Sequence, residues 1–207
     1  MDLVSHAISV VSGDYYSGNI EEQEKVKELE AKTILDHSGI RVHDKLIVDY
    51  GPGFGTFLNF AQSLGAIGVG VEIDPKMAEF QRSRTTAEIV YSPSGRFSIQ
   101  SVDMIVISGV MIHMDIFQIR RFAEDASACL RPGGVLMYNT FESSSFFRDS
   151  RFIDFFMEEE SRYGKGVPTI QKYVDIGTVN SILRFYGIHP TGDGMSVISG
   201  CYKAVRQ

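Results

Sequence analysis

Residues 45–57, with the sequence KLIVDYGPGFGTF, decide the fold class of this chain. A short apolar strand over Lys45–Asp49 leads into a loop in which three glycines stand at alternate positions. We expect the next segment, Thr56–Leu64, to be a helix whose first turn carries the loop. A strand, a glycine loop and a helix start bring backbone N–H groups close to a ligand at the carboxyl edge of a sheet. The stretch therefore predicts an α/β fold with a ligand site at this loop.

The rest of the chain alternates apolar strands with helix-forming segments. Further strands are expected over residues 67–73, 87–91, 103–108 and 135–140, and helices over 21–37, 76–84 and 116–130. Such alternation at short spacing predicts crossover units and a mostly parallel sheet covered on both faces. After a helix over 175–187, strands over 188–191 and 197–205 are expected to pair antiparallel across a 192–194 turn. The predicted fold class is α/β, a doubly wound, mostly parallel seven-stranded sheet with an antiparallel C-terminal strand pair.

Local signals mark the ends of several helices. Asp74 and Pro75 are expected to cap and begin the helix over 76–84, and Asp115 to cap the helix over 116–130. Arg131–Gly134 (RPGG) is expected to stop that helix as a structural turn. The stripe that makes the helix over 21–37 amphipathic consists of Val26, Leu29, Thr33 and His37.

The composition is that of one globular domain. The 207 residues include 43% hydrophobic and 22% charged residues, and the formal net charge is −6. This charge argues against a general nucleic-acid binder, which needs a basic face. No apolar run reaches the about 20 residues of a membrane span, and no basic segment of a signal peptide begins the chain. Cys129 and Cys201 fit neither a metal spacing nor a disulfide framework, so we expect a reduced cytoplasmic protein.

The glycine loop misses one residue of each phosphate-binding motif. Gly51, Gly53 and Gly55 give G-x-G-x-G, and Thr56 stands where the dinucleotide motif has its third glycine. No lysine follows Gly55, as the Walker loop requires. Both phosphate interpretations are therefore disfavoured.

Two acids indicate a ligand of another kind. Asp49, just before the loop, would repel a pyrophosphate but suits a cation or a hydrogen-bond donor. Glu72 closes the next apolar strand, where an acid accepts hydrogen bonds from ribose hydroxyls. Together they predict a nucleoside with a positively charged part and no phosphate, and S-adenosylmethionine fits. The structural alternatives are a tight turn without a ligand for the loop and a solvated strand end for Glu72.

Four motifs in order resemble the class I S-adenosylmethionine-dependent methyltransferases. The stretch DYGPGFG resembles their first motif, and VEIDP at 71–75 resembles the second. The stretch DMIVISGVMIHM at 103–114 resembles their fourth strand with the helix start behind it, and LRPGGVL at 130–136 the loop into the fifth. The resemblance covers about residues 44–205 and implies a Rossmann-like methyltransferase fold. We expect residues 44–207 to form this domain and residues 1–43 to form an arm and helix over its site.

The resemblance also implies cofactor contacts. Asp49 and the three loop glycines would hold the methionine part, Glu72 the ribose, and Ile73 would pack against adenine. Ser92 stands near the position where the family often has an acid for the adenine amine, and Ile112 replaces a frequent glutamate. The expected cofactor-binding residues are Asp49, Gly51, Gly53, Gly55, Glu72, Ile73, Ser92, Ser108, Gly109 and Tyr16.

The acceptor side has fewer signals. His113 and Glu142 are the candidate bases for an acceptor hydroxyl, although His113 at a helix start is as readily a capping or packing residue. Tyr15 and Tyr16 precede the first helix; by resemblance they would close over substrate and cofactor, and the alternative is ordinary packing of the arm. Residues 141–156 hold six of the 14 phenylalanines. Within the substrate-side segment 141–173, Phe146 and Phe147 are the expected substrate contacts.

These expectations converge on one function. We expect a metal-independent methyltransferase that uses S-adenosylmethionine and acts on a small molecule, at oxygen rather than nitrogen. Neither nucleic acid nor membrane is expected as a partner, and the oligomeric state is left open. The alternatives are an NAD(P)-dependent oxidoreductase on a similar sheet and a non-catalytic nucleoside-binding module.

Overall fold

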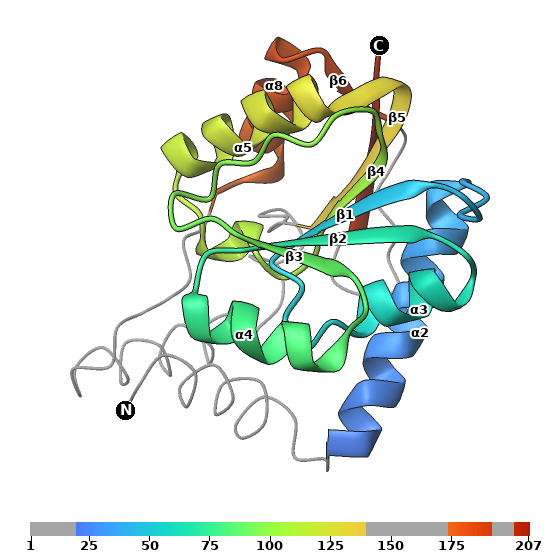
Figure 1. The fold of residues 1–207 in the computed structure, drawn as a ribbon. Helices are drawn as coiled ribbons and strands as arrows, with labels where there is room; N and C mark the ends of the chain where they lie inside the picture. The colour runs from blue at the N-terminus through green and yellow to red at the C-terminus, as the bar shows by residue number, and fades with distance from the viewer. Residues whose placement is uncertain (1–19, 140–173, 192–200) are drawn as a thin grey trace, which may run out of the picture.

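The computed structural model describes residues 20–139, 174–191 and 201–207 (Figure 1). These residues form one seven-stranded sheet with the order β3-β2-β1-β4-β5-β7-β6. Strand β7 pairs antiparallel with β5 and β6, whereas β1 to β5 pair in parallel. The strands are β1 Leu46–Tyr50, β2 Ile67–Glu72, β3 Glu88–Tyr91, β4 Val102–Ile107, β5 Leu130–Asn139, β6 Ile188–Pro190 and β7 Cys201–Arg206. The predicted fold class is confirmed.

Helices cover both faces of this sheet (Figure 1). They are α2 Ile20–Ser38, α3 Thr56–Ser63, α4 Pro75–Arg84, α5 Ile116–Cys129 and α8 Ile176–Phe185, with a short 3₁₀ helix η2 at Met111–His113. Successive side chains of β1 point to opposite faces of the sheet and belong to two separate core clusters. Ile47 packs with residues of α2 and α3, while Val48 packs with residues of α5 and α8. Asp49, the next residue, therefore faces the α2–α3 layer.

Two predicted helix caps are present. The Asp74 side chain accepts hydrogen bonds from the backbone of Lys76 and Met77, with Pro75 in the first turn of α4. Asp115 forms a capping box with Gln118 at the start of α5. Each cap satisfies backbone N–H groups that a helix start leaves unpaired, a contribution of about 1 kcal/mol.

Strand β5 begins five residues earlier than predicted, at Leu130 instead of Val135. Leu130 pairs with Val102, and the register then shifts so that Val135 pairs with Met104. Arg131–Gly134 is thus a bulged part of the strand, so its assignment as a separate turn was wrong. The Arg131 side chain holds the bulge against β4, because it donates a 2.6 Å hydrogen bond to Asp103.

The predicted stripe of α2 is also wrong. Leu29, which was expected on it, is 61% exposed. The helix instead buries Ala31, Ile34 and Leu35 against the sheet and α3. This rotation turns the neighbouring positions Lys27 and Glu30 toward the carboxyl edge of the sheet, where both line a cavity.

The strand order reverses between β1 and β4, because β2 and β3 follow on one side of β1 and β4 and β5 on the other. In open α/β sheets ligands bind at such a switch point, outside the carboxyl ends of the strands. The glycine loop after β1 and the Ser108–Gly109 turn after β4 meet there.

Candidate cofactor-binding site

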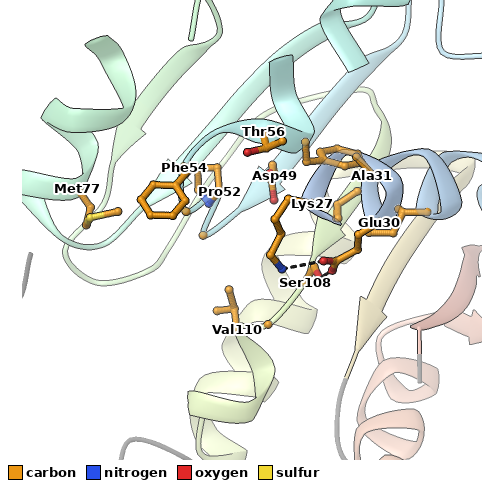
Figure 2. A pocket seen from close by; sticks show the side chains of 16 residues that line it. Lys27, Glu30, Ala31, Asp49, Pro52, Phe54, Thr56, Met77, Ser108 and Val110 are labelled. Atoms are coloured by element: carbon orange, nitrogen blue, oxygen red, sulfur yellow. Dashed lines mark hydrogen bonds and ion pairs between the residues drawn. The ribbon is translucent and has the colours of Figure 1, made fainter. Parts of the chain in front are cut away.

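A cavity of about 260 Å³ lies at the switch point, between α2 and the ends of β1 and β4 (Figure 2). Three regions of the chain form most of its wall: α2, the β1–α3 segment and the end of β4. The lining residues are Lys27, Glu30, Ala31 and Ile34 from α2; Asp49, Gly51, Pro52, Gly53, Phe54, Thr56 and Phe57; Val106, Ser108, Gly109 and Val110; and Met77 from α4.

The glycine loop adopts a backbone that other residues rarely take. Gly51, Gly53 and Gly55 have φ values of 74°, 54° and 76°, in the left-handed region. At Gly51 the packing is also tight, since an added Cβ would lie 2.5 Å from the Val110 side chain. Position 51 can therefore approach the end of β4 this closely only as glycine, and Gly51 and Gly53 form part of the cavity wall.

Asp49 is the buried acid of the site. The carboxyl group lines the cavity and the residue is 4% exposed. The pKa of Asp49 is raised from 3.8 to about 7, mainly by burial and further by the charges of Glu30 and Glu72, while the charge of Lys27 opposes the shift. A buried carboxylate next to a cavity favours a ligand with a positive charge, which would restore the ionised form.

Glu72 is held rigidly at the end of β2. One carboxylate oxygen accepts hydrogen bonds from the backbone of Ile73 (2.8 Å) and Asp74 (3.0 Å), and the other from Gln81 Nε2 (2.8 Å). Gln81 Nε2 also lies 3.0 Å from the carbonyl oxygen of Gly53. Glu72 is thus tied to the glycine loop without lining the cavity itself, and Oε2, which accepts a single hydrogen bond, retains a lone pair for a ribose hydroxyl. Its ribose role stays a prediction.

A hydrogen-bond network joins α2 to the ends of β4 and β5. Ser108 Oγ donates to Glu30 Oε1 at 2.7 Å, and Lys27 Nζ lies 2.7 Å from Glu30 Oε2. Asn139 donates to Ser108 Oγ at 3.2 Å and accepts from the Gly109 backbone at 2.7 Å. Ser108 and Gly109 therefore border the cavity in positions fixed by side chains from two other elements, and their contact with the cofactor stays a prediction.

Sequence reasoning missed Lys27, Glu30, Gln81 and Asn139. In the sequence, the first two are ordinary charges of a polar helix, and Gln81 is an ordinary helix residue. Their roles depend on which face each element presents to the sheet edge. Only Asn139 had a usable signal, because it lies at the end of the fifth predicted strand, beside the site.

The remaining predicted residues of the described part lie near the site without lining the cavity. Ile73 is 56% exposed. Ser92 is buried, and its hydroxyl donates to the Arg96 carbonyl. The Ser92 backbone donates to the Glu72 carbonyl at 2.7 Å, which places both expected adenine contacts beside Glu72. His113 ends η2, and its backbone N–H donates to Val110 at 2.9 Å. The adenine contacts and the base role of His113 stay predictions.

Five predicted site residues lie outside the described residues, namely Tyr15, Tyr16, Glu142, Phe146 and Phe147. The whole 141–173 segment lies outside them too. Within the described ranges, no group of three His, Cys, Asp or Glu residues is arranged to hold a metal ion. A search of the same ranges finds no helix with the length and hydropathy needed to cross a membrane.

Comparison with protein families gives one match that spans most of the chain. Residues 23–187 match a family model described as a methyltransferase domain. No curated protein sequence matches the chain. The matched range begins within α2, so the family pattern covers most of this helix as well as the sheet that follows it.

Solved structures of methyltransferases share the fold. A magnesium protoporphyrin IX methyltransferase from Synechocystis, crystallised with S-adenosylhomocysteine, is 14% identical with a TM-score of 0.69, over 99% of this chain and 94% of that one. An S-adenosylmethionine-dependent methyltransferase from Mesorhizobium loti is 16% identical with a TM-score of 0.64, over 86% and 96% of the two chains. A glycopeptide N-methyltransferase is 13% identical with a TM-score of 0.65, over 86% and 95%. At these identities the likeness concerns the fold alone.

Proposed function

The chain belongs to the class I S-adenosylmethionine-dependent methyltransferase family, and we propose that it methylates an oxygen atom of a small molecule. The observation that carries the proposal is the buried Asp49 carboxylate facing a cavity at the switch point of the sheet. A ligand with a sulfonium and an ammonium group supplies a positively charged partner that stabilises the ionised form of this acid. The overall charge of −6 supports a small acceptor over nucleic acid.

The residues present fit this cofactor. Asp49 and Glu30 contribute negative charge to the cavity, and Lys27 contributes one positive charge. In the glycine loop, Gly51 and Gly53 line the cavity with backbone that no side chain covers. When bound, S-adenosylmethionine supplies a methyl group that its sulfonium already activates, so the proposal includes no metal ion. The contribution of the chain is to orient the reactants and exclude water, which is worth about 7–11 kcal/mol in well-oriented reactions.

A hydroxyl acceptor requires a residue that takes its proton. We assign this role to His113, whose η2 helix follows the cavity-lining Val110 and is joined to it by a backbone hydrogen bond of 2.9 Å. Imidazole has a suitable pKa for this transfer near neutral pH, and general-base catalysis contributes about 10²–10⁴-fold. His113→Asn should therefore lower kcat with a hydroxyl acceptor while leaving cofactor affinity unchanged.

The proposal places the protein in the cytoplasm and treats residues 1–43 as a cover of the site. Among the alternatives, the nicotinamide oxidoreductase is disfavoured by the glycine pattern, since Thr56 begins α3 where the third dinucleotide glycine would stand. The non-catalytic binding module differs from the proposal only in activity.

Two measurements test the proposal. Calorimetry should detect binding of S-adenosylhomocysteine to the wild type, and the absence of binding would refute the cofactor assignment. Transfer of a radiolabelled methyl group should then be screened over small hydroxyl, amine and thiol acceptors. Binding without transfer to any acceptor class would favour the non-catalytic module, and transfer only to amines would overturn the oxygen assignment.

A further inference from the structure

Lys27 and Glu30 bring charge into the cavity from the N-terminal helix. They form an ion pair of 2.7 Å, and both line the cavity beside Asp49 (Figure 2). The Glu30 side chain is only 15% exposed and accepts a second hydrogen bond, from Ser108 of the β4 end. Glu30 is therefore anchored to the sheet as well as to its own helix.

A second ion pair on the same helix shows what an ordinary surface pair looks like. Lys32 and Asp36 are 2.6 Å apart, and their side chains are 61% and 67% exposed. Such pairs contribute little, about 0–1 kcal/mol. The Lys27–Glu30 pair differs because its acid is sheltered and because both residues face the cavity.

The charges around the cavity match an amino acid with its own two charges. Asp49 and Glu30 are acids and Lys27 is a base, so the described wall offers sites for one carboxylate and one ammonium. The charges of Glu30 and Lys27 both act on the pKa of Asp49, which shows that the three groups share one electrostatic environment. A zwitterionic ligand can replace the Lys27–Glu30 contact by one contact to each residue.

We propose that Lys27 and Glu30 recognise the α-amino-acid end of the cofactor. Lys27 binds the cofactor carboxylate, and Glu30 together with Asp49 binds the cofactor ammonium. This inference rests on the proposed function and deepens it. It makes α2 a part of the cofactor site, and the Ser108–Glu30 hydrogen bond the contact that fixes α2 in the binding position.

Three related ligands separate the two roles. S-adenosylhomocysteine carries both charged groups, its decarboxylated analogue keeps only the ammonium, and 5′-methylthioadenosine has neither. Calorimetry should compare the wild type with Lys27→Met, Glu30→Gln and the control Lys32→Met. The glutamine keeps an oxygen to accept the Ser108 hydrogen bond, and the control removes the exposed pair of the same helix.

The expected pattern is specific. Lys27→Met should lower the affinity for S-adenosylhomocysteine by about tenfold or more, equivalent to about 1.4 kcal/mol of binding free energy. Its affinity for the decarboxylated analogue should stay within about twofold of the wild-type value. Glu30→Gln should weaken both ligands that carry the ammonium. Neither variant should change the affinity for 5′-methylthioadenosine, which also reports that the variant is folded, and Lys32→Met should change none of the three.

Other outcomes overturn the inference. An unchanged or higher affinity of Lys27→Met for S-adenosylhomocysteine would mean that Lys27 makes no favourable contact with the carboxylate, or that it occupies the site of the ammonium. An equal loss for all three ligands would assign the pair a structural role. If the wild type binds none of them, the proposed function fails with the inference; if it binds and only the variants disagree, the proposed function stands.

Discussion

Gln81 and Glu72 are joined by a buried hydrogen bond, with Gln81 Nε2 2.8 Å from Glu72 Oε2. The same amide nitrogen lies 3.0 Å from the Gly53 carbonyl oxygen, and Gln81 is completely buried. One side chain of α4 therefore connects the acid after β2 to the glycine loop after β1. Because both regions belong to the proposed cofactor site, disturbing Gln81 should affect binding as well as stability.

Gln81→Met should destabilise the protein by about 1–3 kcal/mol, since the buried Glu72 carboxylate oxygen and the partly buried Gly53 carbonyl lose their donor while the side-chain volume is nearly kept. Urea unfolding of the ligand-free protein measures this loss. Calorimetry with S-adenosylhomocysteine should show weaker binding, because Glu72 and the loop lose their common anchor.

Gln62→Met is the matched control for this substitution. Gln62 is half-buried, and its Oε1 accepts two long hydrogen bonds of 3.3 Å from Thr85 and Thr86. Its replacement should change stability by less than about 0.5 kcal/mol. Equal losses for the two variants would show that the connection made by Gln81 has no special weight.

Asp49→Asn should stabilise the ligand-free protein at high pH. Asp49 has a pKa of about 7 in the folded protein against 3.8 as its ordinary value. Between these values the unfolded chain releases the proton while the folded protein keeps it, so the free energy of unfolding of the wild type falls as pH rises. From pH 5 to pH 8 the wild type should lose up to about 3 kcal/mol relative to Asp49→Asn. Parallel pH profiles of the two proteins in denaturant unfolding would contradict the burial cost assigned to Asp49.

The sequence predicted those parts of the fold that local patterns determine. Apolar runs predicted the strands, and Asp74 with Pro75 predicted a helix start, because a cap needs only neighbouring residues. Arg131–Gly134 was misassigned because proline and glycine normally end elements, whereas pairing with β4 keeps them in the sheet as a bulge. This pairing is set by residues about 28 positions apart, which no local pattern reports.

The same distinction between local patterns and packing applies to the residues of the candidate site. Asp49, Gly51 and Gly53 lie in one continuous motif and line the cavity, whereas Gly55 of the same motif is the N-cap of α3 and does not line it. Lys27 and Glu30 were missed because the rotation of α2 about its axis is decided by packing, which buries the small Ala31 and exposes Leu29. The predictions for Tyr15, Tyr16, Glu142, Phe146 and Phe147 fall outside the described residues and stay predictions.

Cofactor binding should release a proton near neutral pH. If the ligand ammonium pairs with Asp49, only the ionised acid binds well, and with a pKa of about 7 most of Asp49 is protonated at pH 6. The affinity for S-adenosylhomocysteine should therefore rise by about tenfold from pH 6 to pH 8. Calorimetry in two buffers of different ionisation enthalpy counts the released protons. Asp49→Asn serves as the control, and it should bind weakly with this pH dependence removed; a wild-type affinity that is flat over this range would exclude the pairing.

Gly51→Ala should destabilise the protein through a steric collision with Val110, which a second substitution can relieve. The added Cβ would lie 2.5 Å from Val110 Cγ2, and φ at this position is +74°. We expect a loss of about 2–4 kcal/mol, composed of backbone strain of about 1–2 kcal/mol and the steric part. Gly53→Ala is the control for strain alone, because φ is +54° and no atom lies within 4 Å of the added Cβ. In a double-mutant cycle by urea unfolding, Val110→Ala should reduce the cost of Gly51→Ala to about that of Gly53→Ala. Strict additivity of Gly51→Ala and Val110→Ala would show that the loop and the β4 end are not in tight contact.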